Sequence, residues 1–356
     1  MFARRLEAVE QRIIESRLGG LFVTSLPNIR YLTGFTGSNA ILLVRPKGSE
    51  FFTDSRYKIQ AAEEVTHVPV TVAAGKLFEA ASRSIAGGKK GKIGFEANSL
   101  HVSELRKLEG FFGKAAPVPT TGIVEELRVR KEGTEIFSIN RAAEITDRVF
   151  NKILGILKPG VRELEVAAEI SYWHKVFGAE SDSFESLVAS GVRGSLPHGR
   201  PSDKKIQKGE MVTIDMGCRV DGYHCDVSRT VSAGRPNTEL KTIYRIVLDA
   251  QERSLERILP GIPARTVDGI ARAHIRRKGY GKFFGHSLGH GLGLELHELP
   301  RVSMKSNDIL EEGSVITVEP GIYIPQLGGV RIEDDVVVRH HGCEIISKSP
   351  KELLIL

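Results

Sequence analysis

Apolar positions in the first 125 residues follow two periods in turn. Leu6, Val9, Ile13 and Ile14 recur at helical spacing and predict an amphipathic helix over 4–17, which Gly19-Gly20 ends. Short apolar runs predict strands at 21–24, 40–44, 51–53, 68–72 and 92–95, and a further helical pattern covers 57–64. Helices that alternate with strands in this way are typical of an α/β domain.

The pattern breaks around Pro117-Val-Pro119, and 124–131 then leads into a new helix. A chain of 356 residues is long enough for about two domains of roughly 150 residues each. We therefore predict an N-terminal domain over 1–125 and a second domain over 126–356.

The second domain contains a weak internal repeat of its helices. Helical patterns over 139–157 and 239–259 each end at a Pro-Gly pair, Pro159-Gly160 and Pro260-Gly261. A second helical stretch follows each pair, over 163–176 and 267–278. The two copies suggest a duplicated α+β domain with pseudo-twofold symmetry.

The strands that follow the helices repeat as well. The segment 208–217, Lys-Gly-Glu-Met-Val-Thr-Ile-Asp-Met-Gly, resembles 312–321, Glu-Gly-Ser-Val-Ile-Thr-Val-Glu-Pro-Gly. Two glycines and a carboxylate, Asp215 in one copy and Glu319 in the other, match at a constant offset of 104 residues. A carboxylate therefore closes the same apolar strand in each half.

Composition limits the class of protein. Apolar residues make up 41% and charged residues 26% of the chain, as in ordinary globular proteins, and no apolar run approaches the ~18 residues of a membrane span. Acidic residues near the N-terminus argue against a signal peptide. The three cysteines, Cys218, Cys225 and Cys343, are too few for a disulfide framework and indicate a reducing cytoplasm.

The net charge of +6 is spread along the chain. The densest basic stretch, Lys89-Lys90-Gly91-Lys92, lies among glycines and indicates a solvated loop. Aromatic residues make up only 6%, and no basic stripe has interleaved aromatics, so we expect no nucleic-acid partner.

Four acids occupy equivalent places in the two halves. Asp226 follows Asp215 across a predicted hairpin with its turn at Asp221-Gly222, and Glu333 follows Glu319. If the halves face each other, four carboxylates converge and repel one another unless cations separate them. Two divalent cations would balance them charge for charge. The alternative is four unrelated polar strand ends.

Three histidines lie between these acids within twelve glycine-rich residues: His286, His290 and His297. The neighbouring glycines favour a strand or loop over a helix. Histidine is the commonest metal ligand, although a lone histidine is more often a polar surface or core residue. Carboxylates with one imidazole suit Mn²⁺ or Co²⁺ and tolerate Zn²⁺ or Fe²⁺. No Cys-x-x-Cys or Cys/His spacing indicates a thiolate site.

These residues form recognisable motifs. The chain resembles the pita-bread metallopeptidases of family M24, and among them the Xaa-Pro peptidases aminopeptidase P and prolidase, through Pro197-His198-Gly199, Ile214-Asp215-Met216-Gly217, Asp226-Val-Ser-Arg-Thr230, Gly289-His290-Gly-Leu-Gly293, His297-Glu298, Val318-Glu319-Pro-Gly321 and Gly329-Val-Arg-Ile-Glu333. Residues 31–39 and 52–57 resemble the creatinase-type N-terminal domain of that subfamily.

The resemblance implies two divalent metal ions, with Mn²⁺ favoured and Co²⁺ or Zn²⁺ possible. It implies that Asp215 chelates one ion, that Asp226 and Glu333 bridge the pair, and that His290 and Glu319 complete the other site. Glu319 is the candidate for carrying the proton from the attacking water to the leaving nitrogen.

The resemblance also implies a substrate side to the site. His198, His286 and His297 would hold the substrate and stabilise or protonate the intermediate, His198 and His297 with catalytic roles, and Arg331 would lie behind the metal ligands.

The expected function is an Xaa-Pro aminopeptidase acting on short proline-containing peptides, as a homodimer whose N-terminal domains help to form the interface. The alternative within the family is an Xaa-Pro dipeptidase, or prolidase. Outside this activity, the alternatives are a non-catalytic pita-bread binding module and a metal-free hydrolase resembling creatinase. Retention of all five ligand residues counts against both.

Overall fold

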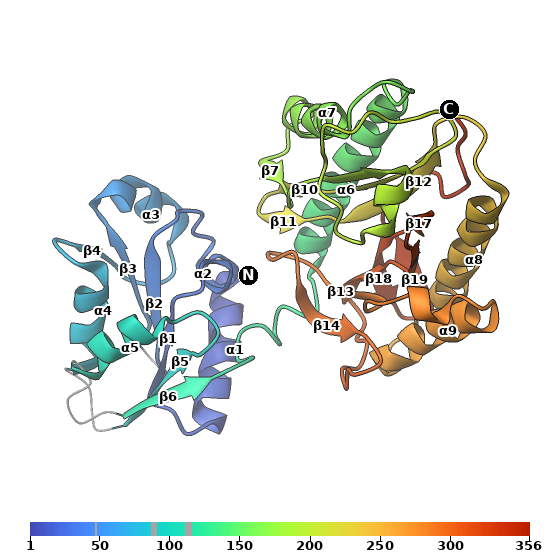
Figure 1. Ribbon diagram of the computed structural model, residues 1–356. Coiled ribbons are helices and arrows are strands. Elements are labelled where there is room, and N and C mark those ends of the chain that lie inside the picture. Colours follow the sequence, from blue (N-terminus) through green and yellow to red (C-terminus); the bar gives the residue numbers. More distant parts are fainter. Residues whose placement is uncertain (47, 87–90, 111–115) are drawn as a thin grey trace. The chain divides into compact units, whose positions relative to one another are not determined.

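The chain divides into two compact units, Met1–Arg128 and Val129–Leu356 (Figure 1). The computed structural model describes residues 1–46, 48–86, 91–110 and 116–356, so Lys89 and Lys90 of the predicted basic loop lie outside the described residues. Within those ranges, no helix is both long and apolar enough to cross a membrane.

A mixed six-stranded sheet forms the centre of the N-terminal unit, with its described strands in the order β4-β3-β2-β1-β5-β6. The strands are β1 (Gly20–Val23), β2 (Ala40–Val44), β3 (Glu50–Asp54), β4 (Val70–Ala73), β5 (Lys92–Glu96) and β6 (Ala116–Thr120). The helices are α1 (Phe2–Glu15), α2 (Leu26–Thr33), η1 (Ser55–Tyr57), α3 (Lys58–Glu64), α4 (Leu77–Ala86) and α5 (Val102–Glu109). Every residue of β1 and β2 is buried, as expected for strands covered on both faces. The α/β prediction is confirmed.

Residues 117–119 do not break the domain as the sequence suggested. Pro117 and Pro119 lie inside β6, which pairs in parallel with β5 at the edge of the sheet. An edge strand tolerates proline, because its outer N–H groups have no neighbouring strand to bond. The prolines therefore mark an edge strand just before the unit ends.

Two helical pairs and the sheets that follow them make up the C-terminal unit (Figure 1). Its helices are α6 (Gly133–Leu154), α7 (Glu163–Val176), η2 (Gly191–Ser195), α8 (Thr238–Leu255), α9 (Ala264–Arg277) and η3 (Gly281–Phe283). The strands of its first half are β7 (Ser181–Asp182), β8 (Leu187–Ser190), β9 (Met211–Met216), β10 (Cys218–Val220), β11 (Tyr223–His224) and β12 (Val227–Ser232). Those of its second half are β13 (Gly289–Gly291), β14 (Glu298–Val302), β15 (Val315–Val318), β16 (Gly321–Ile324), β17 (Gly328–Arg331), β18 (Asp334–Arg339) and β19 (Gly342–Ile345).

The two halves repeat one arrangement. In the first half α6 and α7 precede the sheet β8-β9-β12, and in the second half α8 and α9 precede the sheet that contains β13, β15 and β18. The antiparallel pair β9-β12 corresponds to the antiparallel pair β15-β18. The halves meet where the N–H of Glu333 donates to the carbonyl of Ser228, with an N···O distance of 3.0 Å.

The predicted hairpin turn is present at Asp221 and Gly222. Both residues have positive φ, 50° and 83°, and they connect β10 to β11. Two successive positive φ angles match the right-handed twist of the flanking strands, and Asp-Gly is a common sequence for this turn. The turn returns the chain towards Asp226, so it sets where that carboxylate enters the site.

Candidate metal centre

The ends of the two equivalent strand pairs place four carboxylates together. Asp215 is the fifth residue of β9, and Asp226 immediately precedes β12. Glu319 immediately follows β15, and Glu333 immediately precedes β18. The sequence suggested two acids on adjacent antiparallel strands in each half. In the first half the residue directly opposite Asp215 is Ser228, two positions after Asp226.

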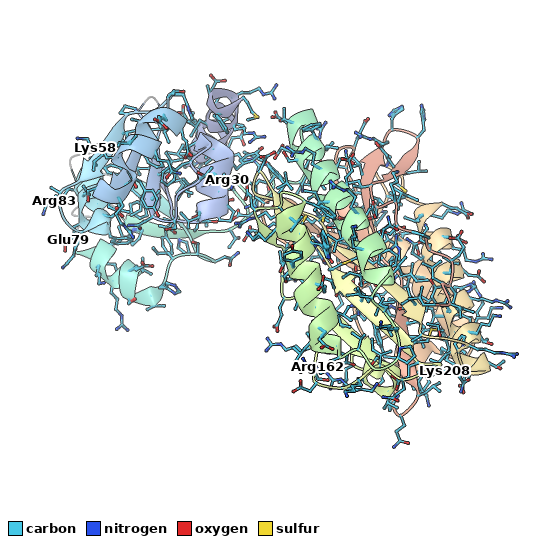
Figure 2. The ribbon with its side chains drawn as sticks, turned by 90° about the horizontal axis from the view of Figure 1, so that it is seen from above. Arg30, Lys58, Glu79, Arg83, Arg162 and Lys208 are labelled. Atoms are coloured by element: carbon cyan, nitrogen blue, oxygen red, sulfur yellow. The ribbon has the colours of Figure 1, made fainter. Side chains whose placement is uncertain are left out.

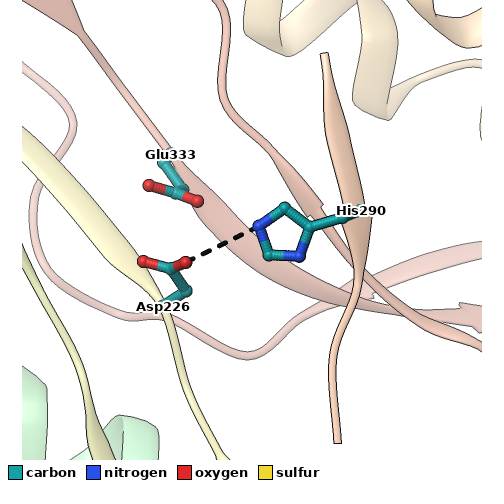
Figure 3. Close-up of side chains that lie close together, drawn as sticks. All are labelled: Asp226, His290 and Glu333. Carbon is teal, nitrogen blue, oxygen red and sulfur yellow. Dashed lines mark ion pairs between the residues drawn. The ribbon is translucent and has the colours of Figure 1, made fainter. Parts of the chain in front are cut away.

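His290 on β13 faces these carboxylates. Its Nε2 lies 3.7 Å from Asp226 Oδ2 and 3.6 Å from Glu319 Oε1. Asp226, His290 and Glu333 each offer one ligand atom, and these atoms all lie within 4.8 Å of one another (Figure 3). The separations exceed hydrogen-bond lengths, yet two metal–ligand bonds of about 2.1 Å would span them.

The main chain fixes the orientation of the His290 ring. Nδ1 lies 3.0 Å from the carbonyl oxygen of Gly291, so Nδ1 carries the proton that this carbonyl accepts. Burial, together with the charge of His297, lowers the pKa of His290 to about 4. The ring is therefore neutral near pH 7, with the Nε2 lone pair directed at the carboxylates, which is the form that binds a metal.

Negative charge in this centre is incompletely compensated by the protein. Burial first, and neighbouring carboxylates second, raise the pKa of Asp226 and of Glu319 well above the usual range and that of Glu333 to about 8. Among the described residues, Asp215 Oδ1 and Asp226 Oδ1 are buried without a hydrogen-bond partner. Buried oxygens without donors are costly unless a cation meets them. The donor set therefore fits divalent metal ions.

This charge arrangement predicts how pH affects the metal-free protein. A carboxyl group whose pKa is higher in the folded than in the unfolded state stabilises the fold at low pH, and the effect is lost as pH rises through the folded value. For Glu333 that window runs from its unfolded pKa of about 4.3 to about 8. We expect the melting temperature of chelator-treated protein to fall between pH 5 and pH 8.

Bound metal should remove most of that slope, because cations compensate the carboxylates. Glu333→Gln should also flatten it in the chelated protein. The check is thermal unfolding at several pH values with and without Mn²⁺. Identical pH dependence in the two series would contradict the charge repulsion inferred here.

Arg331 holds the carboxylate side of the centre in place. Its guanidinium donates to Asp215 Oδ2 at 2.6 Å and to Ser228 Oγ at 2.7 Å, and the Ser228 hydroxyl donates to Glu333 Oε2 at 2.7 Å. It also donates to the carbonyl of Pro197 and to the Tyr323 hydroxyl, each at 2.9 Å. One buried arginine thus links carboxylates from both halves of the unit.

Tyr323 on β16 is a site residue that the sequence did not single out. Its hydroxyl lies 3.0 Å from His286 Nε2, while His286 Nδ1 lies 2.8 Å from the carbonyl of Ser287. The carbonyl fixes the proton on Nδ1, so Nε2 accepts the hydrogen bond from Tyr323. Tyr323 lies two residues after Gly321 and belongs to none of the motifs described above. Its place in the site depends on the pairing of β16 with β17.

The other predicted histidines border the same centre. The His297 ring lies 4.3 Å from the His290 ring, between centroids. Burial first, and the charge of His198 as a lesser cause, lower the pKa values of His286 and His297. His198 is exposed and directly follows Pro197, whose carbonyl accepts a hydrogen bond from Arg331 at the centre. The structure therefore brings all the predicted site residues to one end of the strand pairs.

Comparison with known proteins gives the family. Residues 138–340 match metallopeptidase family M24, and residues 5–130 match the creatinase/prolidase N-terminal domain. The chain belongs to metallopeptidase family M24, and it combines a creatinase/prolidase N-terminal domain with the pita-bread catalytic domain of that family.

Individual relatives are similar over their whole length. The chain is 36% identical to an Xaa-Pro dipeptidase of Pyrococcus furiosus, covering 98% of this chain and 99% of the relative. Among solved structures, an Xaa-Pro dipeptidase from Bacillus anthracis is 41% identical with a TM-score of 0.97, and both chains are covered completely. An X-Pro aminopeptidase from Thermotoga maritima is 36% identical with a TM-score of 0.90, covering 98% of this chain and 99% of that chain.

Proposed function

We propose that this metallopeptidase is an Xaa-Pro dipeptidase that works with two divalent metal ions. The observation that carries the metal-dependent peptidase activity is the cluster of four carboxylates around His290, in which buried oxygens of Asp215 and Asp226 have no hydrogen-bond partner among the described residues. A non-catalytic member of the fold would gain nothing from carboxylates held in this repulsive arrangement.

The preference for a dipeptidase reverses the order expected from the sequence, which put an aminopeptidase first. Full-length similarity to two proteins named Xaa-Pro dipeptidases, at 36% and 41% identity, supports the dipeptidase. Similarity to the X-Pro aminopeptidase of Thermotoga maritima keeps aminopeptidase activity as the second candidate. Both activities break the bond that precedes proline, and they differ in the length of peptide accepted.

We assign the metal-holding residues as the resemblance implies. Asp215 would hold one ion, His290 and Glu319 the other, and Asp226 and Glu333 both. When bound, the two cations would acidify a shared water and polarise the carbonyl of the scissile bond. Oxygen ligands with a single imidazole favour Mn²⁺, with Co²⁺ and Zn²⁺ as alternatives.

The remaining steps fall to side chains of this chain. Glu319, held by a hydrogen bond of 3.2 Å from the Thr317 hydroxyl, would take the proton of the attacking water and deliver it to the proline nitrogen. The leaving nitrogen needs this proton, because an Xaa-Pro bond is a tertiary amide without its own N–H.

Substrate contacts would come from the histidines. His198 and His297 are exposed, and they would donate hydrogen bonds to the developing oxyanion. His286 uses both ring nitrogens within the protein, so it would offer the substrate its ring rather than a proton. Arg331 would act indirectly, through its hydrogen bonds to Asp215 and Tyr323.

The test is hydrolysis of Ala-Pro, Ala-Pro-Ala and Ala-Ala side by side, with protein that has been stripped by a chelator and reconstituted with Mn²⁺. Cleavage of Ala-Pro alone supports the dipeptidase. Cleavage of Ala-Pro-Ala after its first residue would make the enzyme an aminopeptidase. If metal-bound protein cleaves neither Ala-Pro nor Ala-Pro-Ala, the result contradicts both peptidase activities and favours a non-catalytic binding module.

His198→Ala should lower kcat/KM for the cleaved peptide by roughly 10²–10³-fold, the usual effect of losing a donor to an oxyanion. Steady-state kinetics measure this effect. His340→Ala is the matched control, because His340 is an exposed histidine of the same unit at the turn between β18 and β19. If His198→Ala stays within about twofold of wild type, the role given to His198 is wrong.

A homodimer and a cytoplasmic location complete the proposal. The homodimer is implied by the resemblance, and sedimentation of the purified protein tests it. Cys218 and Cys225 are buried free thiols and Cys343 is partly buried and free, which suits a reducing compartment.

A further inference from the structure

The loop that carries His198 begins and ends at one buried carboxylate. The loop runs from Ser190, where β8 ends, through η2 to Ser202. Glu163 is the first residue of α7, and it is completely buried. Its neighbour Arg162 is labelled at the end of that helix in Figure 2.

Both ends of the loop donate to the Glu163 carboxylate. Ser190 donates to Oε1 from its N–H at 2.7 Å and from its hydroxyl at 2.8 Å. Ser202 donates to Oε2 from its N–H at 3.1 Å and from its hydroxyl at 2.7 Å. Two residues twelve positions apart are thus held by one side chain.

A guanidinium inside the loop supplies a further donor. Arg193 Nε donates to Glu163 Oε2 at 3.0 Å, and another nitrogen of the same guanidinium donates to the carbonyl of Arg200. Five hydrogen bonds therefore converge on a single buried carboxylate. Hydrogen bonds to a carboxylate are stronger than those between neutral groups. Glu163 is therefore well suited to hold the two ends of the loop in place.

The metal centre holds the middle of the same loop. The carbonyl of Pro197, the residue before His198, accepts a hydrogen bond of 2.9 Å from Arg331. The exposed His198 is therefore attached to the protein through Arg331 on one side and through the loop ends at Glu163 on the other. Loosening the loop ends removes one restraint on His198 and leaves others, among them the Arg331 contact and the hydrogen bond of 3.1 Å from the Leu164 N–H to the Ser202 carbonyl.

We propose that Glu163 is a positioning residue for catalysis, which fixes the loop 190–202 and so holds His198 at the substrate. The inference rests on the role proposed above for His198. Glu163 touches neither substrate nor metal ligands, so its effect on the reaction passes through His198. A displacement of about 1 Å in a catalytic group can cost on the order of 10²-fold in rate.

Glu163→Gln keeps the side-chain shape and removes the charge and part of the acceptor capacity. We expect kcat/KM for the cleaved peptide to fall by roughly 10–100-fold. This is the same parameter that His198→Ala is expected to lower. In a His198→Ala background, Glu163→Gln should lower kcat/KM by less than about twofold, because the side chain that Glu163 positions is already absent.

Two further variants make the test decisive. Ser202→Ala removes one donor at the far end of the loop and should produce a smaller loss, which is again absent in the His198→Ala background. This variant decides the matter if Glu163→Gln does not fold. Glu165→Gln is the matched control, because Glu165 lies on the same first turn but is exposed, and Gln preserves its capping hydrogen bond.

Hydrogen–deuterium exchange provides a readout that does not depend on activity. Glu163→Gln should accelerate exchange in 190–202 and leave β9 and β15 unchanged. Unchanged exchange in that loop, or equal losses of kcat/KM in both backgrounds, would overturn the inference. Faster loop exchange in an enzyme that cleaves none of the peptides would instead count against the proposed function.

Discussion

Asp226→Asn is expected to lower kcat/KM by at least about 10³-fold and to reduce the bound metal from two ions per chain to one or none. Asp226 clusters with His290 and Glu333 and is assigned to both ions, so an amide there weakens both sites. Bound metal ions supply several kcal/mol of transition-state stabilisation, and each 1.36 kcal/mol corresponds to tenfold in rate. Elemental analysis and steady-state kinetics on the same preparation measure the two effects.

The same substitution should act in the opposite direction on the metal-free fold. Burial and the neighbouring carboxylates raise the pKa of Asp226 well above its usual range, so its charged form destabilises the folded state near neutral pH. Without metal, Asp226→Asn should therefore melt at a higher temperature than wild type at pH 8. With Mn²⁺ present, the order should reverse.

Asp221→Asn is the control for this experiment. Asp221 lies in the turn of the same hairpin with its side chain 60% exposed, and asparagine tolerates its positive φ. It should match wild type in metal content and activity. A metal-stripped Asp226→Asn protein with full activity would contradict the dinuclear mechanism.

Arg331→Met is expected to destabilise the fold by about 3–5 kcal/mol, the usual cost of removing one partner from a buried ion pair. The change leaves Asp215 without its guanidinium and leaves Ser228, Tyr323 and the carbonyl of Pro197 without a donor. For a unit of this size, that loss corresponds to roughly 6–20 °C in melting temperature. Differential scanning calorimetry of the metal-loaded protein measures it.

Arg331→Lys should restore little of the loss, because one ammonium group cannot reproduce the forked geometry of four hydrogen bonds. Arg339→Met is the control, since Arg339 in β18 forms a half-exposed ion pair with Glu344 and should cost less than about 1 kcal/mol. If the Arg331 and Arg339 variants lose equal stability, Arg331 does not organise the centre.

Long periodic elements could be predicted from the sequence almost to the residue. The patterns over 163–176 and 40–44 correspond to α7 and β2, because the first is a helical stretch that follows Pro159-Gly160 and the second is an unbroken apolar run that ends before Pro46. The short helix α2 was missed, although Ser25, Pro27 and Gly34 mark its two ends. Eight residues give too few turns for a period to stand out.

The residues of the candidate centre could be found because metal ligands are restricted to a few residue types in recurring motifs. The residues that support them could not. Tyr323 and Glu163 act through contacts with His286 and with Ser190 and Ser202, and each contact depends on how separate elements pack. Only the three-dimensional arrangement distinguishes Glu163, fully buried, from the exposed Glu165 two residues later.

The dipeptidase and aminopeptidase alternatives depend on a different kind of information. The five proposed metal ligands, Asp215, Asp226, His290, Glu319 and Glu333, would serve the bond-breaking chemistry and are compatible with either activity. Peptide length is limited by what surrounds the substrate beyond the proline, which these five residues do not define. The motifs therefore predict the chemistry, and the peptide assay distinguishes the two substrate lengths.

The most direct measurement is anomalous X-ray scattering from crystals of the chelated protein soaked in Mn²⁺. The account predicts two anomalous peaks per chain within coordination distance of Asp226 and Glu333, one also beside Asp215 and the other beside His290 and Glu319. A single peak, or peaks bound away from these five side chains, would contradict the proposed centre.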